Sequence, residues 1–355
     1  MTLLEKLVAI PSESGREDAA CALVESELRA LGLSPVRVGR SVHATLGSGG
    51  KLLLLNSHLD TVPAGEGWTH SPSGERDGGR LYGRGANDAK GCVAAMLLGA
   101  ARAYAAQAPA GRVCLAFGCE EETSNKGIAE LMAALPAPDA AVVGEPTGLA
   151  PAVAQKGLLL LEVIAKGRSA HAAWGGGVNA VHAAAKDILA LAAISFEKEH
   201  PVLGRPSLQV TQVQGGERHN VIPDRCKLVV DIRTTPDYAP EELVALVQKA
   251  VGGEVVVRSR RLQSVDTPVE HPIVQAAVAA GGGKPFGSPT ASDWAFLKGI
   301  PAVKAGPGDS RRSHTPDEYL ELSELEAGVA FYEGLIRAYH RGSAPESPLG
   351  HEGTP

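Results

Sequence analysis

The apolar and polar positions of the first half of the chain alternate between a helical and a strand-like pattern. Apolar side chains that recur every three or four positions predict amphipathic helices, and short continuous apolar runs predict buried strands. The helices are expected over residues 2–9, 16–31, 88–106 and 126–134. The strands are expected over residues 51–56, 112–118 and 139–143. Between them, residues 64–87 are rich in Gly, Ser and Pro and are expected to form a long loop.

The pattern changes at about residue 157, where paired strands begin to alternate with only two helices. The strands are expected over residues 158–164, 208–214, 226–233 and 254–262. The two helices are expected over residues 178–193 and 240–251. After residue 272 the first pattern resumes, with a short strand over 302–305 and a closing helix over 321–340.

These patterns predict an α/β fold, in which a mostly parallel sheet carries helices on both faces and a smaller α+β domain is inserted. A chain of 355 residues is long enough for two such domains. The first is expected to be discontinuous, over residues 1–157 and 272–340, and the second to span 158–271. Residues 341–355, rich in Gly, Pro, Ser and Glu, are expected to form a disordered tail.

Composition narrows the function classes only a little. The net charge of −6, from 34 Lys and Arg against 40 Asp and Glu, argues against nucleic-acid binding, which needs a concentrated basic surface. The five cysteines follow no zinc-binding spacing and are expected to be buried thiols in a reducing compartment. Charges interrupt the apolar N-terminus, and the chain has no apolar run of membrane-spanning length, so we predict a cytoplasmic protein.

Imidazole and carboxylate groups follow three of the predicted strands directly. His58 follows the first, the run Glu120–Glu122 the second and Glu145 the third. Ligands of open parallel sheets bind beyond the carboxyl ends of the strands, so this placement is the first sign of a site. The candidate metal ligands are His58, Asp88, Glu122, Glu145 and His314. Nitrogen and oxygen donors of this kind suit zinc, manganese or cobalt.

Two neighbours of these ligands have a predicted role as well. Asp60 lies two residues after His58, on the same face of an extended segment, where its carboxylate can fix the imidazole tautomer. A lone His before a turn is more often a surface residue, and an acidic run is more often a solvated loop. Here the buried strand that precedes each of them favours a site instead. Glu122 is then the ligand and Glu121 the general base. Asp88, in a Gly-rich loop, is the candidate bridging carboxylate between two metals.

The chain resembles the M20 family of two-zinc metallopeptidases and deacylases, through five motifs in the family's order. They are His58-Leu59-Asp60-Thr61-Val62-Pro63, Gly83-Arg84-Gly85-Ala86-Asn87-Asp88-Ala89-Lys90-Gly91, Glu120-Glu121-Glu122 with Gly127 after it, Gly144-Glu145-Pro146-Thr147, and Ser313-His314-Thr315-Pro316-Asp317-Glu318. The resemblance implies that His58, Asp88 and Glu145 hold one zinc and that Asp88, Glu122 and His314 hold the other. It also implies that Glu121 is the general base and acid and that Asp60 orients His58. Glu120 stands where the family usually has Asp.

The inserted domain resembles the family's lid and dimerisation domain, which implies a homodimer. Its His171 matches a histidine that reaches the partner's active site and stabilises the developing oxyanion. Asn220 and Arg233 match residues linked to substrate carboxylate binding, and the segments around Ser292 and Gly306 resemble substrate-pocket segments. The Pro that usually follows this His is absent, and Trp174-Gly175-Gly176-Gly177 stands in its place.

Within the family, two segments most resemble the deacetylases of N-acetyl-L-ornithine in arginine biosynthesis. They are Gln155-Lys156-Gly157-Leu158-Leu159 and Phe286-Gly287-Ser288-Pro289-Thr290-Ala291-Ser292-Asp293. The expected reaction releases L-ornithine and acetate with two divalent ions, zinc first, cobalt or manganese otherwise. Succinyl-diaminopimelate, acetylcitrulline, a carrier-protein-linked lysine and dipeptides stay open as substrates. A metal-dependent binding or scaffold protein is the alternative outside enzymes.

Overall fold

The computed structural model describes residues 1–106 and 108–341, and these form two compact units. Of the described residues, the first unit contains 1–106, 108–152, 267–285 and 299–341, and the second contains 153–266 and 286–298. The sequence-based boundaries were set at 157/158 and 271/272, and the segment 286–298 was assigned to the first domain. Of the expected tail, Arg341 ends the last helix, and the remainder lies outside the described residues.

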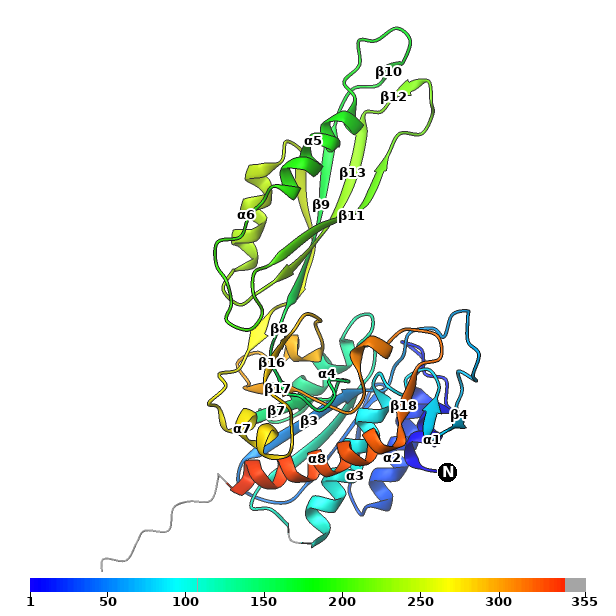
Figure 1. Cartoon of the computed structure of the whole chain (residues 1–355), viewed down its shortest axis with the longest axis vertical. Coiled ribbons are helices and arrows are strands. Elements are labelled where there is room, and N and C mark those ends of the chain that lie inside the picture. The colour runs from blue at the N-terminus through cyan, green and yellow to red at the C-terminus, as the bar shows by residue number, and fades with distance from the viewer. Residues whose placement is uncertain (107, 342–355) are drawn as a thin grey trace, which may run out of the picture. The chain divides into compact units, whose positions relative to one another are not determined.

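The first unit is built on a sheet whose central strands are parallel (Figure 1). Its order is β1-β2-β6-β3-β7-β17. The bounds are β1 Val36–Val38, β2 Ser41–Leu46, β3 Leu52–His58, β6 Arg112–Gly118, β7 Ala140–Val143 and β17 Ala302–Lys304. From β6 to β17 all neighbours are parallel, whereas β1 and β2 add an antiparallel edge. At the other side, Lys304 of β17 pairs antiparallel with Ala152, which begins β8 (Ala152–Gln155).

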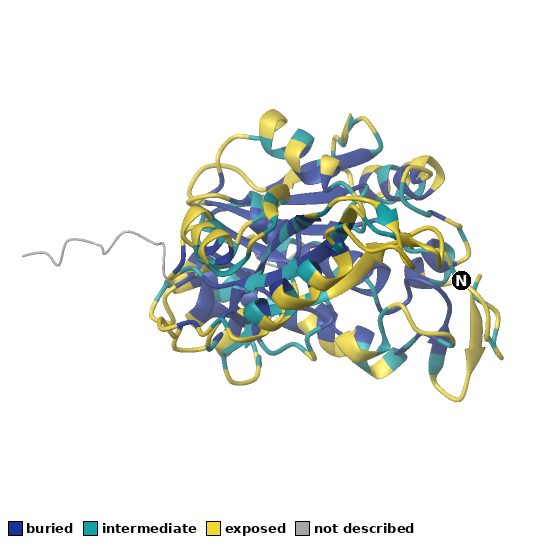
Figure 2. Cartoon of the chain, turned by 90° about the horizontal axis from the view of Figure 1, so that it is seen from above, coloured by how far each residue is buried: buried dark blue, intermediate teal, exposed yellow. Residues whose placement is uncertain are grey.

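Helices cover both faces of this sheet, and the predicted α/β class is confirmed. The bounds are α1 Leu3–Val8, α2 Asp18–Ala30, α3 Lys90–Ala106, α4 Lys126–Ala134, α7 Pro272–Ala279 and α8 Leu322–Arg341. Strand β6 lies on one side of β3 and β7 on the other, so right-handed crossovers place α3 and α4 on opposite faces. Helix α8 lies against α3 (Figure 1), and Gly99 of α3 permits the close approach to Tyr332. Strand β3 is buried at every position, part of the buried interior shown dark blue in Figure 2.

The prediction of a long loop over residues 64–87 is wrong in part, because this segment contains two short strands. These are β4 (Glu75–Asp77) and β5 (Arg80–Tyr82), and β18 (Tyr319–Glu321) pairs with β5 to complete a separate three-stranded sheet. The Asp317 carboxylate also accepts the backbone N–H groups of Thr69 and His70, at 2.8 and 2.9 Å. The partner that orders this segment is therefore more than two hundred residues away, which no local pattern reveals.

The second unit is the expected α+β structure. Its sheet is antiparallel in the order β11-β13-β9-β14. The principal bounds are β9 Gly157–Lys166, α5 Ala180–Ala192, β11 Ser207–Gly215, β13 Arg225–Thr234, α6 Pro240–Ala250 and β14 Glu254–Leu262. The short elements are β10 Ala170–His171, β12 Val221–Ile222, β15 Val265–Asp266 and β16 Phe286–Ser288. Alternate residues of β9 are buried, and they share one apolar core with side chains of α5 and α6.

Among the described residues, no helix combines the length and apolar content that crossing a membrane requires. The five cysteines are buried and free, in agreement with their predicted state as buried thiols. Burial raises the pKa of Cys21 to about 11 and that of Cys114 to about 11. Thiols with such pKa values are poor nucleophiles and poor metal ligands at neutral pH.

Candidate metal centre

The ends of two parallel strands bring the first candidate ligands together. Strands β3 and β6 pair in register from Leu52–Arg112 to His58–Gly118, so His58 lies beside the strand that leads into Glu120–Glu122. The imidazole of His58 is buried, and its Nε2 lies 3.3 Å from Oδ1 of Asp88 and 4.0 Å from Oε1 of Glu145. Glu145 follows β7, the neighbour of β3 on the opposite side from β6.

Asp88 lies between two histidines. Its Oδ1 faces His58, while its Oδ2 lies 3.6 Å from Nε2 of His314, whose ring is also 2.9 Å from Oε1 of Glu122. Ligand atoms of His58, Asp88 and Glu122 all lie within 4.8 Å of one another, close enough to hold one metal ion. Each oxygen of Asp88 thus points to a different imidazole, as a carboxylate that bridges two metals requires. The structure brings together all five candidate ligands.

The cluster concentrates negative charge away from water. Burial, followed by the neighbouring Asp88 carboxylate, raises the pKa of Glu145 to about 8. Burial lowers the pKa of His58, but hydrogen bonds with Asp60 and Asp88 outweigh it and hold this pKa well above its ordinary value. The hydrogen bond with Glu122 likewise raises the pKa of His314. Metal ions displace such protons when they bind, so this donor set fits divalent cations such as zinc, cobalt or manganese.

Asp60 connects the ligand strand with the acidic run. It is fully buried, and its carboxylate accepts the backbone N–H of Glu121 at 2.9 Å, that of Glu122 at 3.1 Å and the hydroxyl of Ser14 at 2.7 Å. The Nδ1 atom of His58 lies 2.9 Å from the backbone carbonyl of Asp60 and 3.5 Å from its carboxylate. The residue therefore holds His58 through its backbone and Glu121–Glu122 through its side chain.

Glu120 turns the chain before Glu121 and Glu122. Its φ of 56° lies in the left-handed region, and its side chain pairs with Arg40 and accepts a hydrogen bond from Ser124. The buried carboxylate of Glu17 accepts the backbone N–H of Glu120 at 3.1 Å and also pairs with Arg40 at 2.6 Å. The Glu120 carboxylate thus stabilises the turn through its contacts with Arg40 and Ser124. These contacts explain why the three glutamates do not form a solvated acidic loop.

Lys304 is a charged residue of this region that the sequence did not single out. It ends β17 and is buried, and burial lowers the pKa of its ammonium group while Glu145, then Glu121 and Asp88, raise it. A buried ammonium within electrostatic range of these carboxylates offsets part of their charge. Its position at the carboxyl end of a parallel strand is the signal that could have found it.

Of the predicted substrate residues, Gly306 lies in the first unit beside Glu145. A Cβ added at Gly306 would lie 2.5 Å from Sγ of Cys92 and 2.8 Å from the carbonyl oxygen of Glu145, so only glycine fits. The other candidates, Asn220, Arg233 and Ser292 together with His171, belong to the second unit.

These four residues differ in how firmly the second unit holds them. His171 and Asn220 are exposed on the segments of the β10–β12 ribbon, where His171 Nδ1 accepts the N–H of Ala173. The Arg233 guanidinium makes two hydrogen bonds with Asp231, at 2.9 and 3.0 Å. Ser292 is buried and donates to Gln155 at 2.7 Å.

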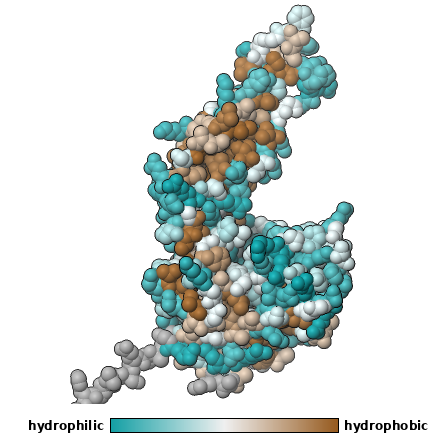
Figure 3. All heavy atoms as spheres, in the orientation of Figure 1, coloured by the Kyte–Doolittle hydropathy of each residue, from teal (hydrophilic) through white to brown (hydrophobic). Residues whose placement is uncertain are grey.

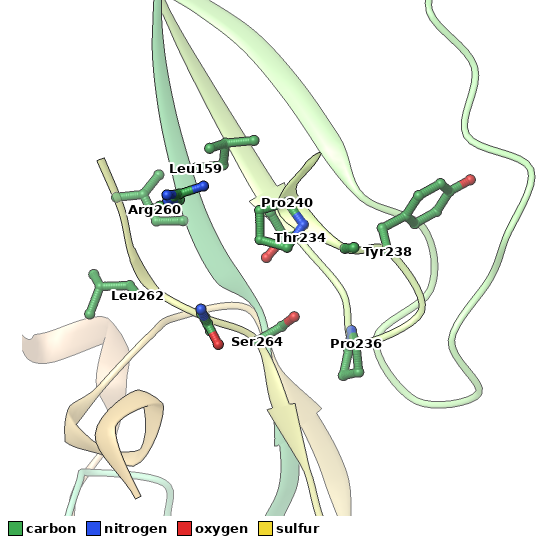
Figure 4. Close-up of a pocket in the computed structure, with 11 residues that line it drawn as sticks. Leu159, Thr234, Pro236, Tyr238, Pro240, Arg260, Leu262 and Ser264 are labelled. Carbon is green, nitrogen blue, oxygen red and sulfur yellow. The ribbon is translucent and has the colours of Figure 1, made fainter. Parts of the chain in front are cut away.

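The second unit also contains a pocket of about 220 Å³ between β9, β13, α6 and β14 (Figure 4). Its one charged lining residue is Arg260, which is paired with Glu241 at 2.9 Å. The other labelled residues include Leu159, Leu262 and Tyr238. The lining offers no set of catalytic or metal-binding groups, so this pocket does not compete with the metal centre as the functional site.

Comparison with known proteins decides the family. The family model described as peptidase family M20/M25/M40 matches residues 54–338. The chain belongs to this family. Two curated relatives are named acetylornithine deacetylase. The protein from Myxococcus xanthus is 33% identical, over 79% of this chain and 78% of its own length. The protein from Proteus mirabilis is 30% identical, over 91% and 92%.

Solved M20 structures share the fold. The M20 metallo-carboxypeptidase Sso-CP2 from Sulfolobus solfataricus has a TM-score of 0.76 at 20% identity, covering 95% of this chain and 98% of its own. The YXEP protein from Bacillus subtilis, titled a dinuclear metal-binding peptidase, has a TM-score of 0.73 at 18% identity, covering 95% and 96%. The predicted resemblance to the M20 family is confirmed, and the chain is a member of a family of hydrolases.

Proposed function

We propose that the protein is a two-metal deacetylase that hydrolyses the amide bond of an N-acyl amino acid, with N-acetyl-L-ornithine as its substrate. The observation that carries the proposal is Asp88, whose two carboxylate oxygens face His58 and His314 separately. The substrate rests on the names of the two relatives, at 33% and 30% identity. Hydrolysis would yield L-ornithine and acetate.

The ligands would divide into two sets that share Asp88. His58 and Glu145 would complete one set, and Glu122 and His314 the other. The distances between the histidine nitrogens and the carboxylate oxygens allow this division. Zinc is the expected metal, and cobalt or manganese would suit the same donors. When bound, such cations lower the pKa of a water molecule and polarise an amide carbonyl.

Glu121 would move the proton. A carboxylate beside the attacking water can take its proton and then deliver it to the leaving amine, which must depart as a neutral group. Asp60 supports this role, because it fixes the backbone N–H of Glu121. Lys304, which interacts electrostatically with Glu121, would offset part of its negative charge.

The second unit would supply contacts to the substrate. His171 would stabilise the developing negative charge on the carbonyl oxygen, a role for which a preorganised donor is effective. Arg233 would bind the α-carboxylate, since a guanidinium can form two parallel hydrogen bonds with it. Asn220, Ser292 and Gly306 would line the substrate site. These assignments rest on the motif resemblance.

A homodimer follows from the proposed role of His171, which would serve the site of the partner. Exposed apolar residues on the second unit support an interface: Leu189 and Val181 on α5 and Val213 on the edge strand β11. Figure 3 shows hydrophobic residues gathered around α5 on the face in view. Mixing a Glu121→Gln protein with a His171→Ala protein should restore about one quarter of wild-type activity after subunit exchange, if the site is shared. Proven exchange without restoration would mean that each site is complete in one chain.

The direct test is an assay with defined metals. Protein stripped with a chelator and reloaded with zinc, cobalt or manganese would be offered N-acetylornithine, N-acetylcitrulline, N-succinyl-diaminopimelate, lysine linked to a carrier protein, and dipeptides. Metal-dependent release of acetate, with the highest kcat/KM for N-acetylornithine, would support the proposal. A higher kcat/KM for another compound would reassign the substrate. Binding of two metals without hydrolysis of any compound would favour the binding or scaffold alternative.

A further inference from the structure

The loop that presents Asp88 is attached to a carboxylate from the far end of the chain. Oε1 of Glu318 accepts the backbone N–H groups of both Asn87 and Asp88, each at 3.0 Å. Glu318 is almost fully buried, with 1% of its surface exposed. Its own carbonyl accepts the N–H of Gly83, at 2.8 Å, so residue 318 contacts both ends of the segment 83–88. A carboxylate that accepts two backbone N–H groups fixes their direction.

A buried arginine completes this support. Nη1 of Arg84 lies 2.6 Å from Oε2 of Glu318, the oxygen that does not accept the backbone N–H groups of Asn87 and Asp88. Nη2 donates to the carbonyl of Ala64 at 3.0 Å, and the guanidinium lies over the ring of Trp68, 5.1 Å from its centroid. Burial raises the pKa of the Glu318 carboxyl, while the Asp88 backbone and Arg84 oppose this. Arg84 thus offsets the cost of keeping a charged carboxylate out of water.

The same loop also reaches the segment that carries His314. The side chain of Asn87 donates to the carbonyl of Asp309 at 3.1 Å and to the hydroxyl of Ser313 at 3.3 Å, and it accepts the N–H of Asp309 at 3.0 Å. His314 follows directly, with a φ of 63°. The backbone that presents Asp88 and the backbone that presents His314 are therefore held to each other through Asn87.

We propose that Glu318, held by Arg84, is a positioning residue that sets where Asp88 presents its carboxylate to the two metals. The inference rests on the proposed two-metal centre and deepens it. Glu318 would act through the backbone N–H groups of Asn87 and Asp88. A bridging carboxylate tolerates little displacement, because each oxygen must meet a different cation.

The test measures cobalt binding by the full-length protein, independently of hydrolysis. Glu318→Ala should weaken Co²⁺ affinity by about 10- to 100-fold, the usual effect of removing a group that orients a ligand. It should also change the visible absorption spectrum of the cobalt-loaded protein, since the coordination geometry shifts. Glu318→Gln keeps one acceptor oxygen for the two N–H groups but loses the ion pair with Arg84, so its cobalt affinity should lie between those of Glu318→Ala and the wild type. Because Gln preserves volume, it remains informative if the Ala variant does not fold.

Glu242→Gln is the matched control. Glu242 also pairs with a cation, Lys198 at 2.9 Å, and accepts a backbone N–H, that of Ala239 at 2.8 Å, but these contacts lie in the second unit. It should bind cobalt as the wild type does. The proposal is overturned if Glu318→Ala binds cobalt with wild-type affinity and spectrum, if Gln is as weak as Ala, or if the control loses as much. Failure of the wild-type protein itself to bind two metals would instead reject the proposed function.

Discussion

The two units hold their candidate residues in opposite ways. In the first unit, His58 and Asp60 are buried; His58 contacts the backbone carbonyl of Asp60, and the Asp60 carboxylate accepts the backbone N–H groups of Glu121 and Glu122. In the second unit, His171 is exposed on a ribbon of two short strands. The difference indicates that the proposed metal centre is built into the fold, where removing its groups would disturb binding, whereas the ribbon presents a side chain that folding does not need.

The largest effect is expected at the first unit, from Glu121→Gln. Loss of the general base should lower kcat by about 10²- to 10⁴-fold. Metal content should stay at the wild-type level, because Gln preserves the shape and the backbone N–H that Asp60 accepts. Steady-state kinetics with N-acetylornithine and metal analysis check both parts. Glu241→Gln, which removes an exposed ion pair of the second unit, serves as the control and should leave kcat unchanged. Near-normal turnover in Glu121→Gln would remove this residue from the role.

A smaller loss of activity is expected in the second unit, from His171→Ala. Removal of one oxyanion-stabilising donor costs about 10²- to 10³-fold in kcat. Metal affinity and unfolding temperature should not change, since the imidazole is exposed and accepts only a local N–H group, that of Ala173. The control is Lys249→Ala, an exposed residue on α6. A fall in metal affinity for His171→Ala would break the contrast between the two units.

The sequence predicted the parts of the site that local pattern determines. His58 and Glu122 follow apolar strands, and parallel pairing of β3 with β6 then brings them together. Features fixed by distant segments were missed. Glu318 meets Asp88 across 230 positions of sequence, and the β4–β5 hairpin depends on β18. For the Asp60 carboxylate, the sequence predicted only a contact with His58. Its hydrogen bonds from the backbone of Glu121 and Glu122 were missed, because backbone groups of another segment cannot be read from the pattern of residue types.

A stability effect confined to the second unit is expected from Asp187→Ala. The Asp187 carboxylate, buried on α5, accepts the N–H groups of Gly252 and Gly253 at 2.8 and 3.1 Å. Its removal leaves both donors without this partner and should cost about 1–3 kcal/mol. Hydrogen exchange should report faster opening around α5 and β14, with cobalt affinity of the first unit unchanged. Asp187→Asn keeps one acceptor oxygen, so its unfolding free energy should lie between those of the wild type and Asp187→Ala. Loss of metal affinity in Asp187→Ala would show that the units are not independent in this respect.

The smallest effect concerns a titrating group in the core of the first unit. Burial lowers the pKa of His340, and Lys51 lowers it further, while the Arg112 backbone and Asp139 oppose the shift. The native state therefore binds fewer protons than the unfolded chain, whose His titrates near pH 6.5. The contribution of His340 to the unfolding free energy is therefore present above about pH 6.5, and it is lost as the pH falls below this value. His340→Leu should flatten the dependence of the unfolding free energy on pH between about 7 and 5, by at most one proton. Denaturant unfolding at several pH values measures this slope, and His182→Ala, on the surface of the second unit, should leave it unchanged. An equally steep slope in His340→Leu would place the acid sensitivity elsewhere in the first unit, with the carboxylates of the metal centre as the next groups to examine.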